Sequence, residues 1–318
     1  MEDHQLHETR TTRKQQKKRK FRKGRIFILL FVLLIASAAL YIFNEYRSGL
    51  ELASETRLPE EPFVPDEPIN NVTNYLIIGV DSRGEEKSRS DTMMLLSWNK
   101  STNELKLVSF MRDIYAEIPG YQSYKLNTAY FLGGVQLLKD TLSGMFDIPI
   151  HHYALIDFHS FESLIDILAP DGIEIDVEKD MSAYIGVSLS QGVQKLNGKE
   201  LLGYARFRHD EAGDFGRVER QQKVIEALKN ELLSPNSIVK LPKLVGAAGG
   251  YITTDMTTAE EISTVTSILL GGGVEIEKLT IPVEGTYSYG SYQHAGSVIE
   301  IDIEQNKNKI HEFINIDS

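Results

Sequence analysis

An uncharged apolar run of 18 residues, from Ile26 to Phe43, constrains this chain more than any other feature. A helix of that length spans roughly 27 Å at 1.5 Å per residue, close to the thickness of one hydrocarbon core. Tyr41 lies near its end, where an amphipathic ring suits a membrane interface. The run continues past Ala36-Ser37-Ala38, a small-residue tract of the kind found at signal-peptide cleavage sites. We therefore expect an uncleaved transmembrane helix over residues 26–43, with a cleaved signal peptide as the alternative.

Basic residues are concentrated immediately before this run. The first 25 residues contain ten Lys or Arg and three acidic residues, although the whole chain has a net charge of −11. Only Arg47 follows the run closely, so the positive-inside rule places residues 1–25 in the cytoplasm as a basic tail and residues 44–318 outside the membrane. Because membrane topology explains the basic run, we expect no nucleic-acid partner.

Residues 44–70 are predicted to form a proline-rich acidic linker. Pro59, Pro62, Pro65 and Pro68 recur at every third position, which matches the three-residue turn of polyproline II. Ten such residues at about 3.1 Å each would make a stiff spacer of roughly 30 Å. A disordered acidic linker is the alternative.

Residues 71–318 show the pattern of a single α/β domain with a mixed sheet flanked by helices. Apolar runs and alternations predict strands at residues 75–80, 92–98, 105–110, 153–158 and 173–177, with a last strand near 274–281. Apolar stripes at spacings of three and four predict helices around residues 135–145, 161–168 and 218–232. Thr258-x-x-Glu261 predicts the capped start of another helix.

Two residue types restrict the chemistry of this domain. The chain has no Cys, which excludes disulfides and thiolate metal sites. The eight His residues form no zinc signature, and we interpret His151 and His152, at the start of a predicted strand, as structural.

Arginines that cluster in short segments of an otherwise acidic domain indicate an anion site. One guanidinium group can bind two phosphate oxygens at once, and neighbouring carboxylates can hold Mg²⁺ against the same phosphate. The residues concerned are Arg83 and Arg89 between Asp81 and Asp91, then Arg112 and Asp113, and finally Arg206, Arg208, Arg217 and Arg220.

Each of these residues also has a simpler explanation. Asp81 and Asp91 could be turn or capping residues, and Arg217 and Arg220 could form surface pairs with acidic neighbours. The chain lacks a phosphate loop of the GxxxxGK[ST] type and a GxSxG nucleophile motif. The residues alone therefore predict an anion site with room for a metal, and no particular reaction.

Five motifs together resemble the LytR-CpsA-Psr family, over about residues 72–315. They occur in that family's order and at similar spacing, and as a set they are highly specific. Ser109-Phe-Met-Arg-Asp113 departs from the family's usual Ser-Ile-Pro-Arg-Asp in the turn before the arginine. The match leaves no room for a further domain. The motifs are Asn74-Tyr-Leu-Ile-Ile-Gly-Val-Asp-Ser-Arg83, Arg89-Ser-Asp-Thr92, Arg112-Asp113, Lys125-Leu-Asn127 with Gly133-Gly134, and the arginine-rich block that ends at Gln221.

The resemblance implies a phosphotransferase that moves a glycopolymer phosphate, such as wall teichoic acid or capsule, from undecaprenyl pyrophosphate to peptidoglycan. It implies that Asp81 and Asp91 hold Mg²⁺ or Mn²⁺, that Asp81, Asp91 and Arg112 are catalytic, and that one of the two aspartates or Asp113 is the base. An apolar tunnel in the fold would hold the lipid. The substrate-binding residues expected are Arg83, Arg89, Arg112, Lys125, Asn127, Arg206, Arg208, Arg217, Arg220 and Gln221.

Two other functions remain open at this point. The outer domain could be a non-enzymatic regulator or binding protein for lipid intermediates. It could also be a lipid-pyrophosphate hydrolase, in which water replaces the acceptor hydroxyl.

Overall fold

The computed structural model describes residues 23–53, 58–67, 69, 71–82, 88–271 and 275–315, and all structural statements below refer to these residues. The chain divides into two compact units, Met1–Ile42 and Phe43–Ser318, which are described separately. The basic tail at residues 1–22 and Arg83 lie outside the described residues.

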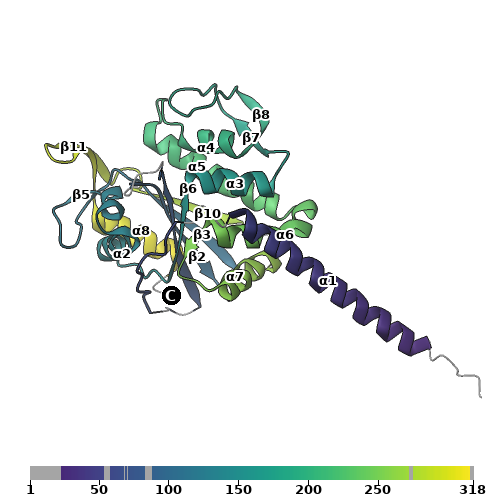
Figure 1. The fold of residues 1–318 in the computed structure, drawn as a ribbon. Helices are drawn as coiled ribbons and strands as arrows, with labels where there is room; N and C mark the ends of the chain where they lie inside the picture. Colours follow the sequence, from purple (N-terminus) through teal and green to yellow (C-terminus); the bar gives the residue numbers. More distant parts are fainter. Residues whose placement is uncertain are drawn as a thin grey trace, which may run out of the picture. The chain divides into compact units, whose positions relative to one another are not determined.

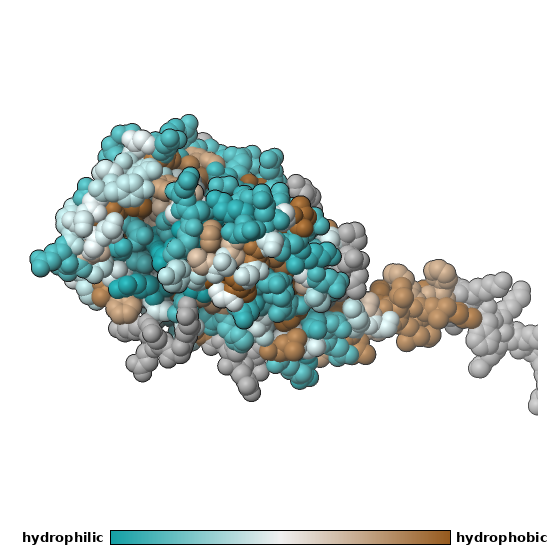
Figure 2. Space-filling model, turned by 90° about the horizontal axis from the view of Figure 1, so that it is seen from above, coloured by the Kyte–Doolittle hydropathy of each residue, from teal (hydrophilic) through white to brown (hydrophobic). Residues whose placement is uncertain are grey.

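The first unit contains the start of helix α1 (Lys23–Ala53). Within the described part of the chain, this is the one helix long and apolar enough to cross a membrane, with a mean hydropathy of 2.9 and none of that stretch buried. Its exposed apolar side chains form brown surface in Figure 2. The predicted membrane helix at residues 26–43 lies inside this longer helix, so α1 is a candidate membrane anchor.

The second unit is built on a mixed six-stranded sheet (Figure 1). Its strand order is β10-β3-β2-β1-β6-β9. β1 pairs in parallel with β6, and β3 with β10, while the remaining neighbours are antiparallel. The strands are β1 (Val72–Val80), β2 (Ser90–Asn99), β3 (Glu104–Phe110), β6 (His152–Asp157), β9 (Thr253–Thr254) and β10 (Ile276–Ile281).

Helices cover both faces of this sheet, which explains why β1 is apolar almost without interruption. Leu76, Ile78 and Val80 face a core made with α2 and α8. Ile77 and Gly79 point the other way, toward α3, α4 and α5. The helices are α2 (Asn127–Phe146), α3 (Phe158–Leu168), α4 (Gly198–Arg206), α5 (Gly213–Leu232), α6 (Pro235–Tyr251), α7 (Thr258–Leu270) and α8 (Ile303–Ile314). The predicted α/β architecture is confirmed.

Three two-stranded sheets complete the unit. β7 (Ile173–Val177) pairs with β8 (Gly192–Leu196), and β4 (Tyr115–Ala116) with β5 (Tyr124–Lys125). β11 (Tyr287–Tyr292) and β12 (Gly296–Ile301) form a hairpin that continues into α8. The prediction that the strand near residue 281 is the last one was therefore wrong, because the Tyr-, Ser- and Gly-rich β11 has no apolar alternation.

The start of α7 differs from the prediction by one residue. Thr257 is the N-cap, and its side chain and that of Glu260 bond each other's backbone N–H groups. The prediction of Thr258 and Glu261 was wrong because two Thr and two Glu stand side by side, so the same motif fits both registers. His151 is buried, and its Nδ1 accepts a hydrogen bond from the Asn74 N–H at 2.9 Å, so its structural role is confirmed.

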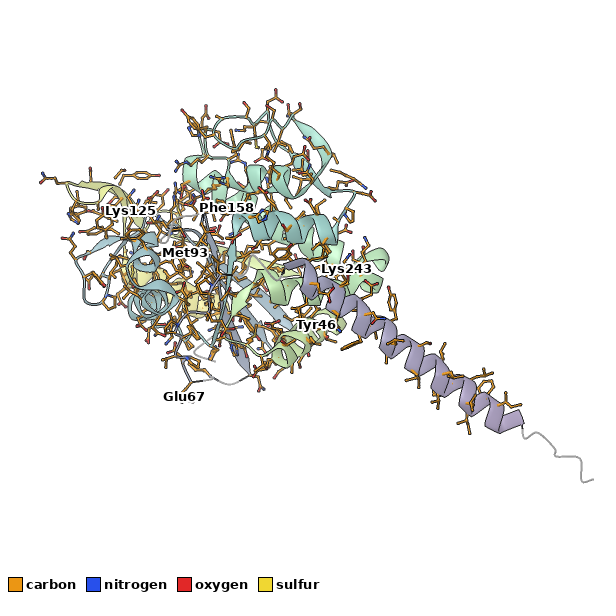
Figure 3. The ribbon with its side chains drawn as sticks, viewed as in Figure 1. Tyr46, Glu67, Met93, Lys125, Phe158 and Lys243 are labelled. Carbon is orange, nitrogen blue, oxygen red and sulfur yellow. The ribbon has the colours of Figure 1, made fainter. Side chains whose placement is uncertain are left out.

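The predicted linker is not a free spacer where it is described. α1 extends through Ala53, and its last turns contact α6 so closely that a Cβ on Gly246 would lie 2.1 Å from the Tyr46 carbonyl oxygen. Tyr46 and Lys243 mark this contact in Figure 3. Farther along, the Asp66 carboxylate accepts from the Ile150 N–H at 2.8 Å and pairs with the buried Lys139 ammonium at 2.5 Å. Residues 58–67 are thus held by hydrogen bonds to the domain.

Candidate active site

One edge of the large sheet gathers the predicted site residues. β1, β3 and β6 run in the same direction, so Asp81, Arg112 and Phe158, which follow them, meet at their carboxyl ends. β2 runs the other way and brings Asp91, near its start, to the same edge. In open α/β sheets this edge is the usual place for a ligand.

A cavity of about 350 Å³ lies there, and we call it the arginine cavity. Four arginines line it in a domain that is otherwise acidic, which makes it suited to a polyanion. The lining residues are Asp91, Thr92, Arg112, Phe158, Ala183, Tyr184, Leu202, Ala205, Arg206, Arg208, His209, Arg217 and Gln221.

Arg112 and Arg217 are held by two shared carboxylates. Asp91 Oδ1 lies 2.5 Å from Arg112 Nη1 and 3.8 Å from Arg217 Nη1. Asp214 lies 3.6 Å from Arg112 Nη2 and 2.9 Å from Arg217 Nη2. Packing fixes both guanidinium groups, since their side chains are only 14% and 4% exposed. The four groups form a closed ring of alternating charge at the cavity wall.

The ring affects its two arginines differently. Burial alone would lower the pKa of Arg112, but the charges of Asp214 and Asp91 outweigh it and raise that pKa. Burial, reinforced by the charge of Arg112, lowers the pKa of Arg217. The Nε atoms of both arginines are buried and have no hydrogen-bond partner among the described residues. An unsatisfied buried donor costs about 1–3 kcal/mol, and the carboxylate nearest to Arg112 Nε is that of Asp113 at 3.7 Å.

Arg206 and Arg208 reach the same cavity through a break in the helix. α4 ends at Arg206, and Phe207 adopts an extended conformation with φ −62° and ψ 131°. The glycines and acids of residues 208–216 predict a loop there, with the preceding helix ending by about Arg206 and both arginines turned toward one ligand. The structure confirms the end of the helix, and both arginines line one cavity. The Arg206 guanidinium lies 4.6 Å above the Phe158 ring and 3.5 Å from Asp81. The expected loop over residues 208–216 was too long, because α5 begins at Gly213.

Arg220 is a correction to the predicted site. Its side chain is 3% exposed and does not line the cavity. Its guanidinium donates to Glu178 at 2.8 Å and to the Phe207 carbonyl oxygen at 3.1 Å, and it also bonds Asp210. Because all three of its donor nitrogens are occupied, Arg220 fastens the chain around Phe207 and Asp210 to α5.

Four further predicted residues also lie outside the cavity lining, and one of them, Asp81, contacts the lining residue Arg206 at 3.5 Å. Lys125 pairs with Asp113 at 2.8 Å, and Asp113 lies 3.7 Å from Arg112 Nε. Lys125 is therefore linked to Arg112 only through Asp113. Asn127 is buried, and its N–H donates to the Arg112 carbonyl oxygen at 3.2 Å. Arg89 is exposed and lies 5.7 Å from the centre of the Phe131 ring.

Sequence reasoning missed three residues of the site. Asp214 closes the charged ring, and only its position within the arginine-rich block could have indicated it. Tyr184 and His209 stack at the cavity rim with ring centres 4.5 Å apart, and Tyr184 is 85% exposed. They come from separate loops, so no sequence spacing links them.

An apolar cavity of about 120 Å³ adjoins the arginine cavity between the sheet and helices α3 to α5. The two cavities share Thr92, Phe158, Leu202, Ala205 and Gln221. Gln221 therefore lies at the boundary between a cationic space and an apolar one. A ligand with a charged head and an apolar chain would match this arrangement.

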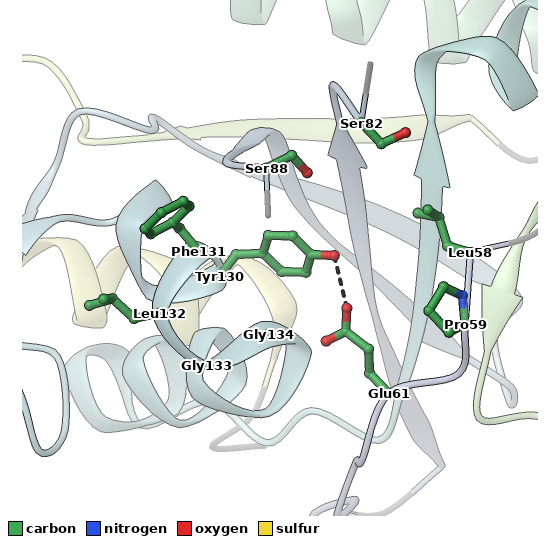
Figure 4. A pocket seen from close by; sticks show the side chains of 10 residues that line it. All are labelled: Leu58, Pro59, Glu61, Ser82, Ser88, Tyr130, Phe131, Leu132, Gly133 and Gly134. Carbon is green, nitrogen blue, oxygen red and sulfur yellow. Dashed lines mark hydrogen bonds between the residues drawn. The ribbon is translucent and has the colours of Figure 1, made fainter. Parts of the chain in front are cut away.

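A third cavity, of about 370 Å³, lies beside the kink of α2 (Figure 4). Glu61, from the predicted linker, accepts hydrogen bonds there from the Tyr130 hydroxyl at 2.9 Å and the Val135 N–H at 2.6 Å. Gly134 has φ 66°, and a Cβ on it would lie 2.1 Å from the Glu61 carboxylate. Burial and the charge of Glu61 raise the pKa of Tyr130. Glu61 thus occupies the helix N-terminus that a bound anion would otherwise use.

Comparison with known proteins identifies the family of this chain. A sequence profile described as the LytR_cpsA_psr family matches residues 49–310. The Regulatory protein MsrR of Staphylococcus aureus is 42% identical over 279 residues, covering 87% of this chain and 85% of MsrR. The polyisoprenyl-teichoic acid--peptidoglycan teichoic acid transferase TagU of Bacillus subtilis is 33% identical over 223 residues, covering 70% of this chain and 72% of TagU.

A solved structure shares the fold. The crystal structure of B. subtilis TagV superposes with a TM-score of 0.65 at 25% identity, covering 77% of this chain and 98% of that one. The profile matches most of the second unit, in which the arginine cavity lies. The chain therefore belongs to the LytR_cpsA_psr family.

Proposed function

We propose that this protein is a membrane-anchored transferase that moves a glycopolymer phosphate from undecaprenyl pyrophosphate to peptidoglycan. Its membership of a family that includes a teichoic acid transferase supports transfer of a cell-wall polymer. The observation that carries the proposal is the junction of two cavities, one lined by Arg112, Arg206, Arg208 and Arg217 and the other apolar. A polyprenyl pyrophosphate has a charged head and an apolar tail that match this junction.

The proposed reaction forms one P–O bond and breaks another. An acceptor hydroxyl of peptidoglycan attacks the phosphorus that bears the polymer, the bond to the bridging oxygen breaks, and undecaprenyl phosphate leaves with the electron pair. The hydroxyl proton passes to a carboxylate base, for which Asp81, Asp91 and Asp113 are the candidates. Charge on the phosphoryl oxygens is balanced by fixed guanidinium groups, which is where most catalysis of phosphoryl transfer arises.

Asp81 and Asp91 are our candidates for holding Mg²⁺ or Mn²⁺. The described residues contain no group of three or more His, Asp or Glu side chains that could hold a metal alone. Mg²⁺ is nevertheless commonly bound by one or two carboxylates together with substrate phosphate oxygens, and this donor set fits that pattern. When bound, the metal would add positive charge at the pyrophosphate. Asp91 would then exchange part of its contact with Arg112 for the metal.

Orientation in the membrane is part of the proposal. Ten basic residues before Ile26 support, by the positive-inside rule, an N-terminus in the cytoplasm and a second unit outside the membrane. Protease added to intact wall-less cells should remove the second unit. Protection of that unit from the protease would contradict this topology.

The decisive experiment separates transfer from two other activities. The full chain in lipid nanodiscs is incubated with a lipid-pyrophosphate glycan, peptidoglycan oligomers and Mg²⁺, and the products are resolved by mass spectrometry. Transfer predicts a phosphodiester between polymer and peptidoglycan. Release of polymer phosphate without that product would indicate a hydrolase, and tight lipid binding without turnover would favour the regulatory role suggested by the name of MsrR.

A further inference from the structure

The hairpin β11–β12 and the adjoining strands β4 and β5 carry an unusual concentration of aromatic rings. Five of the 14 tyrosines in the chain lie there. We define the aromatic ridge as Tyr115, Tyr124, Phe215, Tyr287, Tyr289, Tyr292 and His294. Tyr115 and Tyr292 stack with ring centres 4.4 Å apart and 11° between their planes, and Phe215 lies 5.2 Å from Tyr287. The rings thus support one another in fixed orientations.

Part of the ridge faces solvent and does not serve the core. Tyr289 is 71% exposed and Tyr292 is 36% exposed, while His294 is also exposed. Tyr289 contacts Tyr287 in a T-shaped arrangement with 87° between the rings, and most of the Tyr289 side chain remains exposed. Ordered aromatic groups on a surface are typical of binding sites, because a rigid ring contributes contact area at low entropic cost.

Two backbone connections link the ridge to residues that hold the arginines of the cavity, although no ridge residue lines the cavity itself. Phe215 directly follows Asp214, whose carboxylate holds Arg112 and Arg217 at the cavity wall. On the other side, the Ile299 N–H of β12 donates to the Asp113 carbonyl oxygen at 2.8 Å. Asp113 is the residue after Arg112. The ridge is therefore attached at two points to the segments that carry Arg112 and Asp214.

The chemistry of the ridge fits a neutral sugar chain. Aromatic faces pack against the C–H face of a pyranose ring, while tyrosine hydroxyls can bond its hydroxyl edge. The Tyr292 hydroxyl donates to Glu300 at 2.6 Å, and Lys125, opposite Tyr115, is already paired with Asp113. A carboxylate beside the rings disfavours a polyphosphate chain.

We propose that the aromatic ridge binds the N-acetylhexosamine strand of the acceptor peptidoglycan and directs its hydroxyl toward the arginine cavity. This inference rests on the proposed transferase function and specifies where the acceptor lies. The donor polymer is the competing occupant, and it differs from the acceptor strand by its phosphate charges.

The test measures glycan binding without donor or divalent metal. The full chain in nanodiscs is titrated calorimetrically with the N-acetylglucosamine tetramer. Tyr289→Ala and Tyr292→Ala should each weaken binding about 3- to 10-fold, the effect of losing one aromatic contact. Tyr289→Phe should remain within about twofold of wild type, because the ring is retained. Tyr121→Ala is the matched control, since Tyr121 is 52% exposed but lies outside the ridge.

Several results would overturn the inference. The inference is wrong if the wild-type protein does not bind the tetramer at millimolar concentration. It is also wrong if both ridge variants bind the tetramer with wild-type affinity. Variants that lose affinity for a polyol-phosphate oligomer but keep the tetramer would assign the ridge to the donor. Thermal unfolding of each variant shows whether it is folded. If Tyr292→Ala is destabilised, Tyr289→Ala alone tests the inference.

Binding and transfer can fail independently. If the tetramer binds through the ridge but no phosphodiester forms, the transferase proposal fails and the ridge remains a glycan-binding surface. If transfer proceeds and the KM for peptidoglycan is unchanged in both ridge variants, the ridge inference fails and the transferase proposal stands.

Discussion

Replacing Arg220 by Ala tests whether this arginine holds the fold or binds the ligand. The structure places its guanidinium among Glu178, Asp210 and the Phe207 carbonyl oxygen, with 3% of the side chain exposed. Without it, Asp210, itself 5% exposed, keeps one charged partner, the exposed Lys179 at 3.3 Å, and the Gly213 N–H at 3.1 Å. We therefore expect a variant that is markedly less stable but still able to bind the substrate head group.

The magnitude follows from the burial of the pair. Removing one partner of a buried ion pair costs about 3–5 kcal/mol, because the remaining charge is left without compensation. In a domain of this size each kcal/mol corresponds to about 2–4 °C, so Tm should fall by about 6–20 °C. Differential scanning calorimetry of the full chain in nanodiscs measures this shift, and inorganic pyrophosphate titrated well below Tm measures anion binding.

Arg206→Ala is the matched control. Arg206 is 27% exposed and contacts Phe158 and Asp81, so its loss should cost less than about 1.5 kcal/mol of stability. Pyrophosphate binding should instead weaken by about 1.5–3 kcal/mol. A Tm within 2 °C of wild type for Arg220→Ala, with pyrophosphate binding lost, would refute the assignment and return Arg220 to the binding site.

Three further predictions concern the cavity and its surroundings. Arg208→Ala should weaken pyrophosphate binding by about 1.5–3 kcal/mol. The loss of binding free energy in the Arg206/Arg208 double variant should differ from the sum of the two single losses, and Arg→Lys should restore little binding because the planar guanidinium is lost. Wild-type affinity in both single alanine variants would refute this prediction. Asp81→Asn and Asp91→Asn should each lower Mg²⁺-dependent transfer at least about 100-fold. Tm should change little for Asp81→Asn but fall for Asp91→Asn, which loses the charge that pairs with the buried Arg112 and Arg217. A lower Tm for Asp81→Asn with its specific activity retained would make Asp81 structural. Although burial alone would raise the pKa of Asp210, hydrogen bonds and charge from Arg220 and Lys179 lower it. The stability that ionised Asp210 contributes is fully present above about pH 4, the ordinary carboxyl range, and is lost as pH falls through its lower pKa in the folded protein. If Arg220→Ala unfolds in acid with the same pH dependence as wild type, Arg220 does not cause this effect.

The sequence alone determined the features that depend on local composition and period. An 18-residue uncharged run predicts a helix long enough for a membrane because length and hydropathy suffice for that conclusion. Val135, Leu138, Leu142 and Met145 are all buried, as their spacing predicts, because a helix places them on one face. The end of α4 at Arg206 also followed from a local pattern, the glycines and acids after it.

Tertiary structure decided which charged residues share a site. Arg217 and Arg220 lie three residues apart on α5, and the sequence gives them equal status. Packing turns Arg217 toward the arginine cavity and Arg220 toward Glu178 and Asp210. Partners for a charge come from distant segments, so no periodicity in the sequence indicates them. The same holds for Asp66, whose partner Lys139 lies on α2 and binds a segment that the prolines predicted to be a free spacer. A proline repeat sets only the local backbone preference of this segment. Its attachment to the domain depends on carboxylates that contact a lysine and backbone N–H groups from distant parts of the chain.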